Sequence, residues 1–194
     1  MLGSVQNYED VTIYPLDDDK EQLLLAAQNE CTFIWSNKDG WPVGVIMSYV
    51  FQDAKFWLTA SAQRLRISAV RRDPRVCICV TSKGTTLGAN STVTYKGTCE
   101  LSQDDATKAW FYPALAKVLR PDDKTAQKNF VAFLDSPNRI ILSVTPTQRI
   151  GYDGVKMGRA TKAWLDSRPA AAPSVTTECD NGMRGALGNS APGQ

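Results

Sequence analysis

The chain has 194 residues, of which 43% are hydrophobic and 22% charged, and this is enough for one globular domain with its own core. The 22 basic and 20 acidic residues give a net charge of +2, which argues against a general nucleic-acid binder, since such domains are strongly basic. The sequence contains no histidine, which excludes hydrolases with a histidine base and most zinc sites with imidazole ligands.

The sequence also carries no sign of export or of membrane insertion. No apolar run reaches the roughly 18 residues of a membrane span. The first ten residues lack the basic start and apolar core of a signal peptide. We interpret most of the cysteines as buried, reduced thiols, and we expect a cytoplasmic protein without membrane contact. The cysteines are Cys31, Cys77, Cys79, Cys99 and Cys179.

The first part of the chain is typical of a helix followed by antiparallel strands. Residues 17–30 predict a short helix with an acidic first turn. Residues 31–36 and 41–50 predict two strands, joined by a hairpin turn at an Asp-Gly pair that tolerates positive φ. A third strand is predicted over residues 55–60 after a second turn.

The middle of the chain changes from a helical to a strand pattern. Residues 61–73 predict a helix that ends before Pro74, because the residue preceding a proline is disfavoured in the helical region. The nearly unbroken apolar run at residues 75–81 predicts a central strand. Residues 92–101 alternate between apolar and polar side chains, which predicts a strand with one buried face.

Two helices and a final strand region complete the predicted elements. The helices are expected over residues 104–120 and 122–134, and Pro113 is expected to kink or split the first. Residues 138–154 predict one or two strands. The mostly antiparallel order favours a small barrel or a curled sheet with helices at its edges.

The composition predicts a boundary near the C-terminus. After about residue 167 the chain is rich in Ala, Pro, Gly, Ser and Thr and poor in large apolar residues. Such a segment cannot bury enough surface to offset its ordering entropy. We therefore expect one domain over residues 1–166 and a flexible tail over residues 167–194.

An arginine cluster is the most unusual local feature of the sequence. A solvated helix face is one interpretation of it. A phosphate site is the other, because Thr59 and Ser61 lie where a strand passes into a helix, and hydroxyl caps and free N–H groups there favour an anion. On an ideal helix Arg64 and Arg66 would lie about 200° apart, so convergence on one anion needs an irregular helix start or long side chains that wrap around it. The cluster consists of Arg64, Arg66, Arg71, Arg72 and Arg75.

The stretch "DGWPVGVIMSYVFQDAKFWLTASAQRLRISAVRRDPRVCICV", followed by "VTYKGTCEL", resembles the pyridoxamine 5′-phosphate oxidase-like family. The resemblance runs from about Cys31 to Gly154, and its most specific element is the series T-x-S-x-x-R-x-R and R-R-D-P-R-V. It implies a mainly β (α+β) protein: a six-stranded antiparallel split β-barrel with peripheral helices. It further implies a homodimer with two flavin sites in the grooves between the subunits.

The resemblance also implies which residues hold the cofactor. Arg64 and Arg66 match the phosphate-binding positions, and Thr92 matches a polar residue that reaches the cofactor from a later strand. Taken alone, the apolar matches could equally be barrel core, and Thr92 could be an ordinary exposed strand residue. The full implied set is Val45, Ile46, Met47, Ser48, Leu58, Thr59, Ser61, Arg64, Arg66 and Thr92.

The function implied by the resemblance is a flavin-dependent oxidoreductase. FMN would bind at the dimer interface, and hydride would pass to or from a small organic substrate or electron donor. The alternatives are a deazaflavin-dependent reductase, a non-catalytic flavin or haem carrier or sensor, and an interaction protein with solvated arginines. The substrate-binding histidine and arginine of the vitamin B6 oxidases have no match near the C-terminus, so oxidation of pyridoxamine phosphate is not expected.

The sequence assigns no catalytic residue and no metal ligand. Tyr49 and Tyr95 are hydroxyl groups that could deliver a proton, on residue type alone. A deazaflavin has a longer acidic tail than FMN and would require further cations, for which Arg71, Arg72 and Lys83 are candidates. A protein that uses FMN would not need them.

Overall fold

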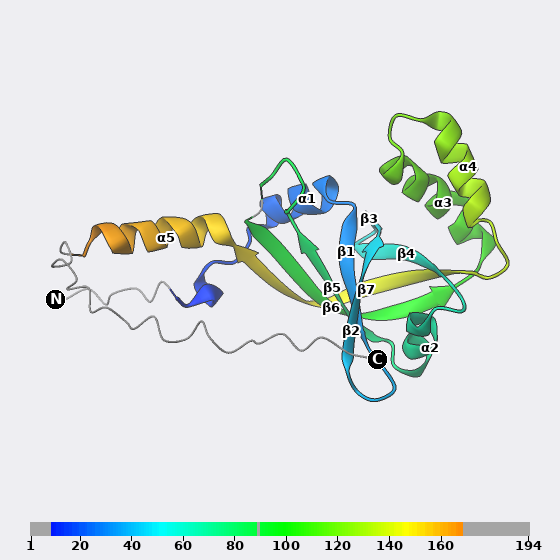
Figure 1. Ribbon diagram of the computed structural model, residues 1–194, viewed down its shortest axis with the longest axis horizontal. Helices are drawn as coiled ribbons and strands as arrows, with labels where there is room; N and C mark the ends of the chain where they lie inside the picture. Colours follow the sequence, from blue (N-terminus) through cyan, green and yellow to red (C-terminus); the bar gives the residue numbers. More distant parts are fainter. Residues whose placement is uncertain (1–8, 89, 169–194) are drawn as a thin grey trace, which may run out of the picture.

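The computed structural model of the chain describes residues 9–88 and 90–168 (Figure 1). In chain order the elements are a 3-10 helix (Val11–Ile13), α1 (Asp18–Ala27), β1 (Glu30–Ser36), β2 (Pro42–Ser48), β3 (Val50–Gln52), β4 (Lys55–Ser61), α2 (Leu65–Arg72), β5 (Arg75–Thr81), β6 (Ser91–Ser102), α3 (Asp105–Leu119), α4 (Lys124–Leu134), β7 (Arg139–Asp153) and α5 (Gly154–Asp166).

The seven strands of the described chain form one antiparallel sheet in the order β2-β1-β5-β6-β7-β4-β3. The two edge strands, β2 and β3, are separated in the sequence by Tyr49 alone. Because one residue advances the chain by only about 3.8 Å, the two edges must meet there. The sheet therefore curls into a half-barrel, which is the split-barrel arrangement.

The inner face of the curled sheet holds the main hydrophobic core. Phe33, Phe56 and Ile78 point inward from three strands and are fully buried. Helices α1 and α2 add Leu24 and Ile67 to the same cluster. Burial of each such side chain contributes about 1.5–3 kcal/mol, so the core fixes the curvature that brings the sheet edges together.

A second, smaller core lies between the sheet and the α3–α4 hairpin. The ring of Trp57 on β4 meets Trp110 on α3 edge-to-face, with centroids 4.9 Å apart. Phe111 and Ile141 are fully buried in the same cluster. The hairpin is therefore fixed to the outer side of β4 and β7, and Trp57 is a packing residue.

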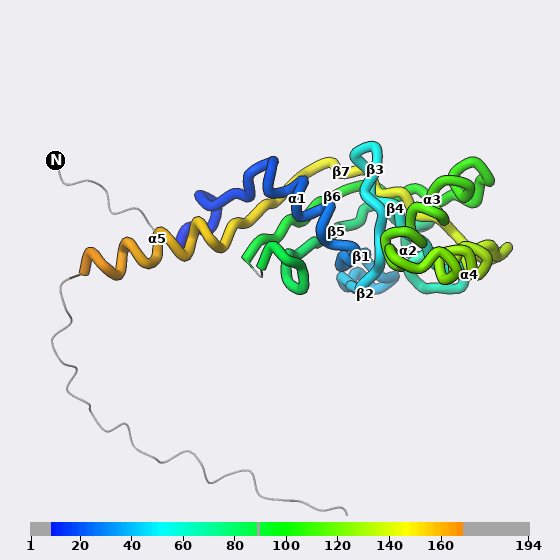
Figure 2. The backbone as a smooth tube through the Cα atoms, turned by 90° about the horizontal axis from the view of Figure 1, so that it is seen from above, coloured from blue at the N-terminus to red at the C-terminus, as the bar shows by residue number. Residues whose placement is uncertain are grey.

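Helix α5 follows β7 directly, and it was missed in the sequence analysis. Asp153 caps it, since the side chain accepts hydrogen bonds from the backbone N–H groups of Val155 and Lys156. In both views α5 projects away from the sheet, at the end opposite to α3 and α4 (Figures 1 and 2). No residue of α5 is buried.

Several predicted boundaries were wrong. The sheet has seven strands and not six, because Tyr49 turns inward and divides the predicted strand at residues 41–50 into β2 and β3. The helix predicted over residues 61–73 begins only at Leu65. Helix α3 is not split, since it continues through Pro113 over 15 residues.

Other predictions are confirmed. Strand β5 has the predicted bounds, and β6 buries the predicted face of alternating residues. The single strand β7 covers most of residues 138–154. Of the predicted tail, residues 169–194 lie outside the described part of the chain. No helix within the described part is long and apolar enough to cross a membrane.

Candidate functional site

A cavity of about 240 Å³ lies where β2, β4, α2 and the start of β7 meet the α3–α4 hairpin. The hairpin supplies an apolar wall, and Arg139 supplies a cation from β7. No acidic residue lines the cavity. Five of the predicted cofactor-binding residues are brought together here: Ile46, Met47, Ser48, Thr59 and Arg66.

The turn between β4 and α2 places Arg66 in this cavity. The N–H group of Ala62 donates to the carbonyl of Asn138 at 2.7 Å, which holds the turn against the residue before β7. Arg64 is the N-cap of α2, with extended backbone angles (φ −72°, ψ 136°) and no side-chain cap. These angles are ordinary for an N-cap, and Arg64 is exposed and does not line the cavity, so the structure does not bring Arg64 and Arg66 together at one site.

The prediction that hydroxyl groups cap α2 was wrong, because the N-cap is Arg64. Thr59 does not cap α2, because its hydroxyl group donates to the carbonyl of Ile140 on β7 at 2.9 Å. Ser61 is half-buried at the end of β4 and pairs in register with Arg139. The hydroxyl of Thr59 thus stabilises the junction of β4 with β7.

The guanidinium group of Arg66 lacks a partner. Its Nε atom is buried and makes no hydrogen bond within the described chain. Burial, and then the positive charge of Arg64, lower the pKa of Arg66, although arginine keeps its proton at neutral pH. A partly buried cation without a counter-charge is unfavourable. The site therefore fits an anion such as a phosphate, which offers several acceptor oxygens.

Arg139 was missed by the sequence analysis. It is the first residue of β7, its Nε atom is also buried without a hydrogen-bond partner, and its guanidinium carbon lies 5.3 Å from the ring centroid of Phe133. Nothing in the sequence marks it, because it is joined to the site only through the pairing of β7 with β4.

The remaining predicted residues do not line this cavity. Leu58 and Val45 face the inner core, so their side chains are barrel packing. Thr92 pairs with Tyr152 at the α5 end of the sheet. Ser102, which lies beside the cavity end of β7, follows Thr92 by ten residues, or about 30 Å of strand. Within one chain, Thr92 therefore cannot reach a ligand in the cavity.

The two candidate proton donors have structural roles. The hydroxyl of Tyr49 donates to the carbonyl of Leu25 at 3.3 Å, and the hydroxyl of Tyr95 donates to the carboxylate of Glu21. Burial is the main cause that raises the pKa of both tyrosines. Both hydroxyls are buried and already donate a hydrogen bond within the protein, so neither faces a substrate.

The cations suggested for a longer acidic tail also lie elsewhere. Arg72 donates to the carbonyl of Ser36 at 2.8 Å and lines another depression beside Trp35. Arg71 is exposed, and Lys83 lies in the loop after β5. None of them lines the cavity that holds Arg66.

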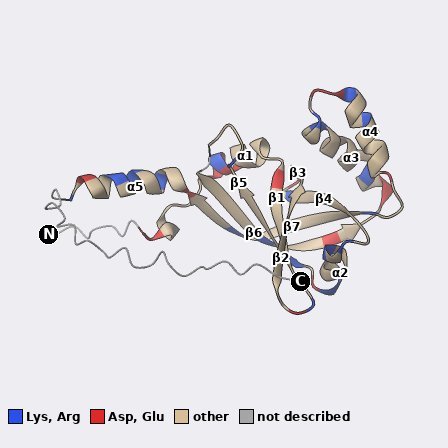
Figure 3. Cartoon of the chain, viewed as in Figure 1, with Lys and Arg blue, Asp and Glu red and all other residues tan. Residues whose placement is uncertain are grey.

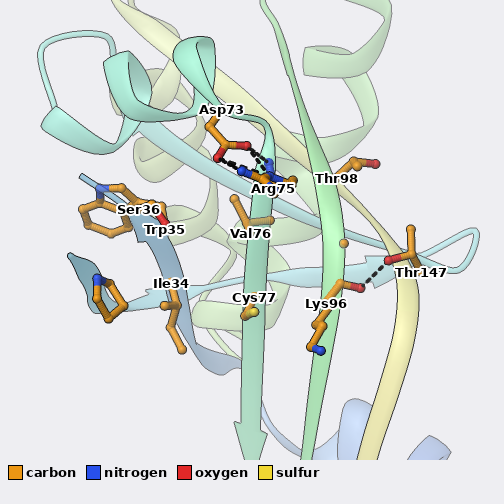
Figure 4. Close-up of a pocket in the computed structure, with 12 residues that line it drawn as sticks. Ile34, Trp35, Ser36, Asp73, Arg75, Val76, Cys77, Lys96, Thr98 and Thr147 are labelled. Carbon is orange, nitrogen blue, oxygen red and sulfur yellow. Dashed lines mark hydrogen bonds and ion pairs between the residues drawn. The ribbon is translucent and has the colours of Figure 1, made fainter. Parts of the chain in front are cut away.

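A larger cavity, of about 630 Å³, lies near one end of β1, β5 and β6 (Figure 4). At its rim Arg75 pairs with Asp73 at 2.7 Å, and this hydrogen bond is the main cause that lowers the pKa of Asp73 to about 2. None of the predicted cofactor-binding residues lines this cavity. Across residues 9–88 and 90–168, no group of three or more acidic, cysteine or histidine residues could hold a metal ion.

Comparison with known proteins identifies relatives of this arrangement. The family model described as pyridoxamine 5′-phosphate oxidase matches residues 18–147. A search of curated proteins finds no match.

Similar solved structures share the fold at low sequence identity. A conserved hypothetical protein from Mycobacterium tuberculosis has a TM-score of 0.64 at 18% identity, covering 74% of this chain and 88% of its own. A candidate pyridoxamine 5′-phosphate oxidase from Listeria innocua has a TM-score of 0.53 at 17% identity, covering 69% and 95%. An F420 reductase has a TM-score of 0.51 at 19% identity, covering 66% and 94%. At this identity the likeness is one of fold.

Proposed function

Because the chain belongs to the pyridoxamine 5′-phosphate oxidase-like family, we propose that it is a flavin-dependent oxidoreductase that binds FMN and transfers hydride to or from a small organic substrate. One observation carries the proposal: five residues implied by the family resemblance gather around one cavity, and one of them, Arg66, is a cation without a partner. FMN would supply the hydride chemistry, and the protein would supply binding and orientation.

The residues of the cavity would have distinct parts in binding. The planar guanidinium of Arg66 can hold two phosphate oxygens at once. Ile46, which is 63% exposed, offers an apolar edge next to it. At about 240 Å³ the cavity is smaller than the roughly 300–1,000 Å³ of sites that enclose a whole drug-sized ligand, so it fits the phosphate end only.

A second copy of the chain would complete the site. On the outer face of the sheet, cross-strand pairing sets Ile46, Thr32, Cys79, Thr94 and Ile150 in one uncharged row. The end residues Ile46 and Ile150 are 63% and 52% exposed, which is unusual for isoleucines on a sheet face. The strands carry few charged positions (Figure 3).

Such an uncharged, partly apolar face favours contact with another protein surface. A homodimer that buries this row is the arrangement in which Thr92 could take the role that the resemblance gives it, since within one chain it is too far from the cavity. Light scattering of the purified protein tests the dimer.

Two other functions stay open within the same family. One solved relative is an F420 reductase, and Arg139 adds a cation to the cavity, which favours a deazaflavin with a more acidic side chain. The lack of a recognisable substrate site in the sequence favours a carrier or sensor. Turnover of the bound cofactor with NAD(P)H or a reduced deazaflavin separates an enzyme from a carrier.

The identity of the cofactor is tested by the absorption spectrum and mass of the ligand released from freshly purified protein. We expect FMN, and release of the deazaflavin would select the alternative. A colourless protein that takes up neither cofactor would contradict the proposal.

In an FMN titration, Arg66→Gln should weaken binding at least about tenfold, since hydrogen bonds to charged groups contribute about 1.5–3 kcal/mol. Arg71→Gln, which removes an exposed arginine of the same helix, is the matched control.

A further inference from the structure

We infer that Arg139 is a second anion-binding residue, which together with Arg66 forms a two-arginine clamp on one phosphate group. The inference deepens the proposed function, since it concerns the same cavity. It also changes the assignment that the family resemblance implies, because the partner of Arg66 becomes Arg139 in place of Arg64.

The backbone brings the two arginines to one place. Strand β7 pairs with β4 so that Arg139 lies opposite Ser61, the last residue before the turn into α2. The hydrogen bond from Ala62 to Asn138 closes this junction one residue further along each strand. Arg66 lies in the first turn of α2, so both side chains enter the cavity from fixed elements.

Neither arginine is neutralised by the protein. The Nε atoms of Arg66 and Arg139 are both buried without a hydrogen-bond partner, and no carboxylate lines the cavity. An anion bound in the cavity would supply the missing acceptors and offset both positive charges. A phosphate dianion has enough acceptor oxygens to receive hydrogen bonds from two guanidinium groups.

An aromatic pair on α4 positions Arg139. Its guanidinium carbon lies 5.3 Å from the ring centroid of Phe133, and this ring stacks on Phe130 with centroids 6.2 Å apart. At the other end of the pair Arg120 lies over Phe130, at 5.8 Å, but it donates to the carbonyl of Leu119 and does not line the cavity. Arg120 is therefore a matched control: the same residue type on the same aromatic pair, outside the site.

The experiment compares Arg139→Gln, Arg64→Gln and Arg120→Gln with the unaltered protein. Three probes are titrated: FMN, riboflavin, which lacks the phosphate, and inorganic phosphate, whose binding is followed by the rise in melting temperature. We expect Arg139→Gln to weaken FMN binding at least about tenfold, to leave riboflavin binding unchanged and to remove the stabilisation by phosphate. Arg64→Gln and Arg120→Gln should change FMN affinity less than about threefold.

The outcomes separate this inference from the proposed function. If FMN binds the unaltered protein and Arg139→Gln equally well, the inference is wrong and the flavin proposal stands. If phosphate stabilises the unaltered protein and not Arg139→Gln while no flavin binds, the inference stands and the flavin proposal fails. If phosphate and FMN bind to neither protein, both are wrong.

A second variant distinguishes a loss of binding from a folding defect. Arg139→Lys keeps the charge and loses the planar fork, and we expect it to fold and to bind FMN with an affinity between those of Arg139→Gln and the unaltered protein. If both variants at this position fail to fold, Arg139 is a structural residue and the inference is overturned.

Discussion

The two ends of the curled sheet differ in whether their cations are paired with carboxylates. At the α5 end, Arg149 on β7 bonds to Asp18 at 2.9 Å and to Glu21, and Lys20 bonds to the buried carboxylate of Asp153 at 2.6 Å. At the α3–α4 end, Arg66 and Arg139 have buried nitrogens and no carboxylate.

The difference separates cations that hold the fold from cations that are left for a ligand. The paired residues join α1 to the sheet, since Glu21, Asp18 and Lys20 lie on α1 and their partners on β7. The arginines at the other end form no ion pair between elements, and their charge is unfavourable until an anion binds. Position in the fold, and not residue type, decides which role an arginine has.

The largest effect is expected at the paired end. Arg149→Met leaves the carboxylate of Glu21, which is 8% exposed, with the hydroxyl of Tyr95 as its remaining partner. Breaking a buried pair from one side costs about 3–5 kcal/mol, and because Arg149 is itself partly exposed we expect about 3 kcal/mol less free energy of unfolding in urea. FMN affinity should not change.

The exposed pair of Lys162 and Asp166 on α5 gives the control for this variant. Their side chains are 75% and 64% exposed, so Lys162→Met should alter the free energy of unfolding by less than about 0.5 kcal/mol. If Arg149→Met lost no more than this, the ion pairs of Arg149 with α1 would contribute nothing to stability, and the contrast between the two ends would disappear.

A smaller loss of stability, whose size depends on pH, is expected from Asp153→Asn. Burial acts to raise the pKa of Asp153, but the hydrogen bonds from Lys20 and from two backbone N–H groups outweigh it, so the pKa lies below its usual 3.8. The stabilisation is therefore present above the unfolded pKa and is lost as the pH falls through the folded one.

Near neutral pH we expect Asp153→Asn to lower the free energy of unfolding by about 2 kcal/mol, because a hydrogen bond to a charged group is lost. The difference between the two proteins should shrink below about pH 4. Urea unfolding at several pH values measures it. A difference that does not vary with pH would show that the ionic contact with Lys20 contributes nothing.

At the unpaired end, removal of a cation should raise the free energy of unfolding instead of lowering it. Arg66→Met removes a partly buried charge without a partner, so in phosphate-free buffer the free energy of unfolding should rise by about 1 kcal/mol. With saturating phosphate the unaltered protein should gain stability and the variant should not. Thermal melts with and without phosphate measure both, and Arg71→Met, on the exposed part of α2, should show neither change. A variant less stable than the parent in phosphate-free buffer would make Arg66 a structural residue.

Local sequence patterns predicted the parts of the fold that depend on local periodicity. The bounds of β5 and the buried face of β6 follow from runs and alternation of apolar residues. The resemblance also paired Arg64 with Arg66 at one phosphate, although an ideal helix would place them about 200° apart. Of that pair, only Arg66 lines the cavity.

The rest depends on contacts between distant parts of the chain. Arg139 reaches the cavity only because β7 pairs with β4, and no local pattern records that pairing. Helix α5 was missed because it buries no residue and contains two glycines, which are poor helix formers. Turn geometry is hidden for the same reason: nothing in "FQDA" indicates that Ala54 has a φ of 56°.

The smallest effect concerns this turn, and it provides a reference that touches neither set of cations. Asp53 and Ala54 form the turn between β3 and β4, both with positive φ, where hairpins favour Asn-Gly or Asp-Gly. Glycine relieves the strain of a left-handed alanine, which is about 1–2 kcal/mol. Its greater freedom in the unfolded chain destabilises the folded state by about 0.4–1 kcal/mol. Ala54→Gly should therefore add about 0.5 kcal/mol to the free energy of unfolding. Ala109→Gly, the same change at an exposed position inside α3, should instead remove about 1 kcal/mol. Changes of opposite sign in the free energy of unfolding in urea, with FMN affinity constant in both variants, would assign the gain to the backbone angle of Ala54. Changes of the same sign would mean that the turn is not strained.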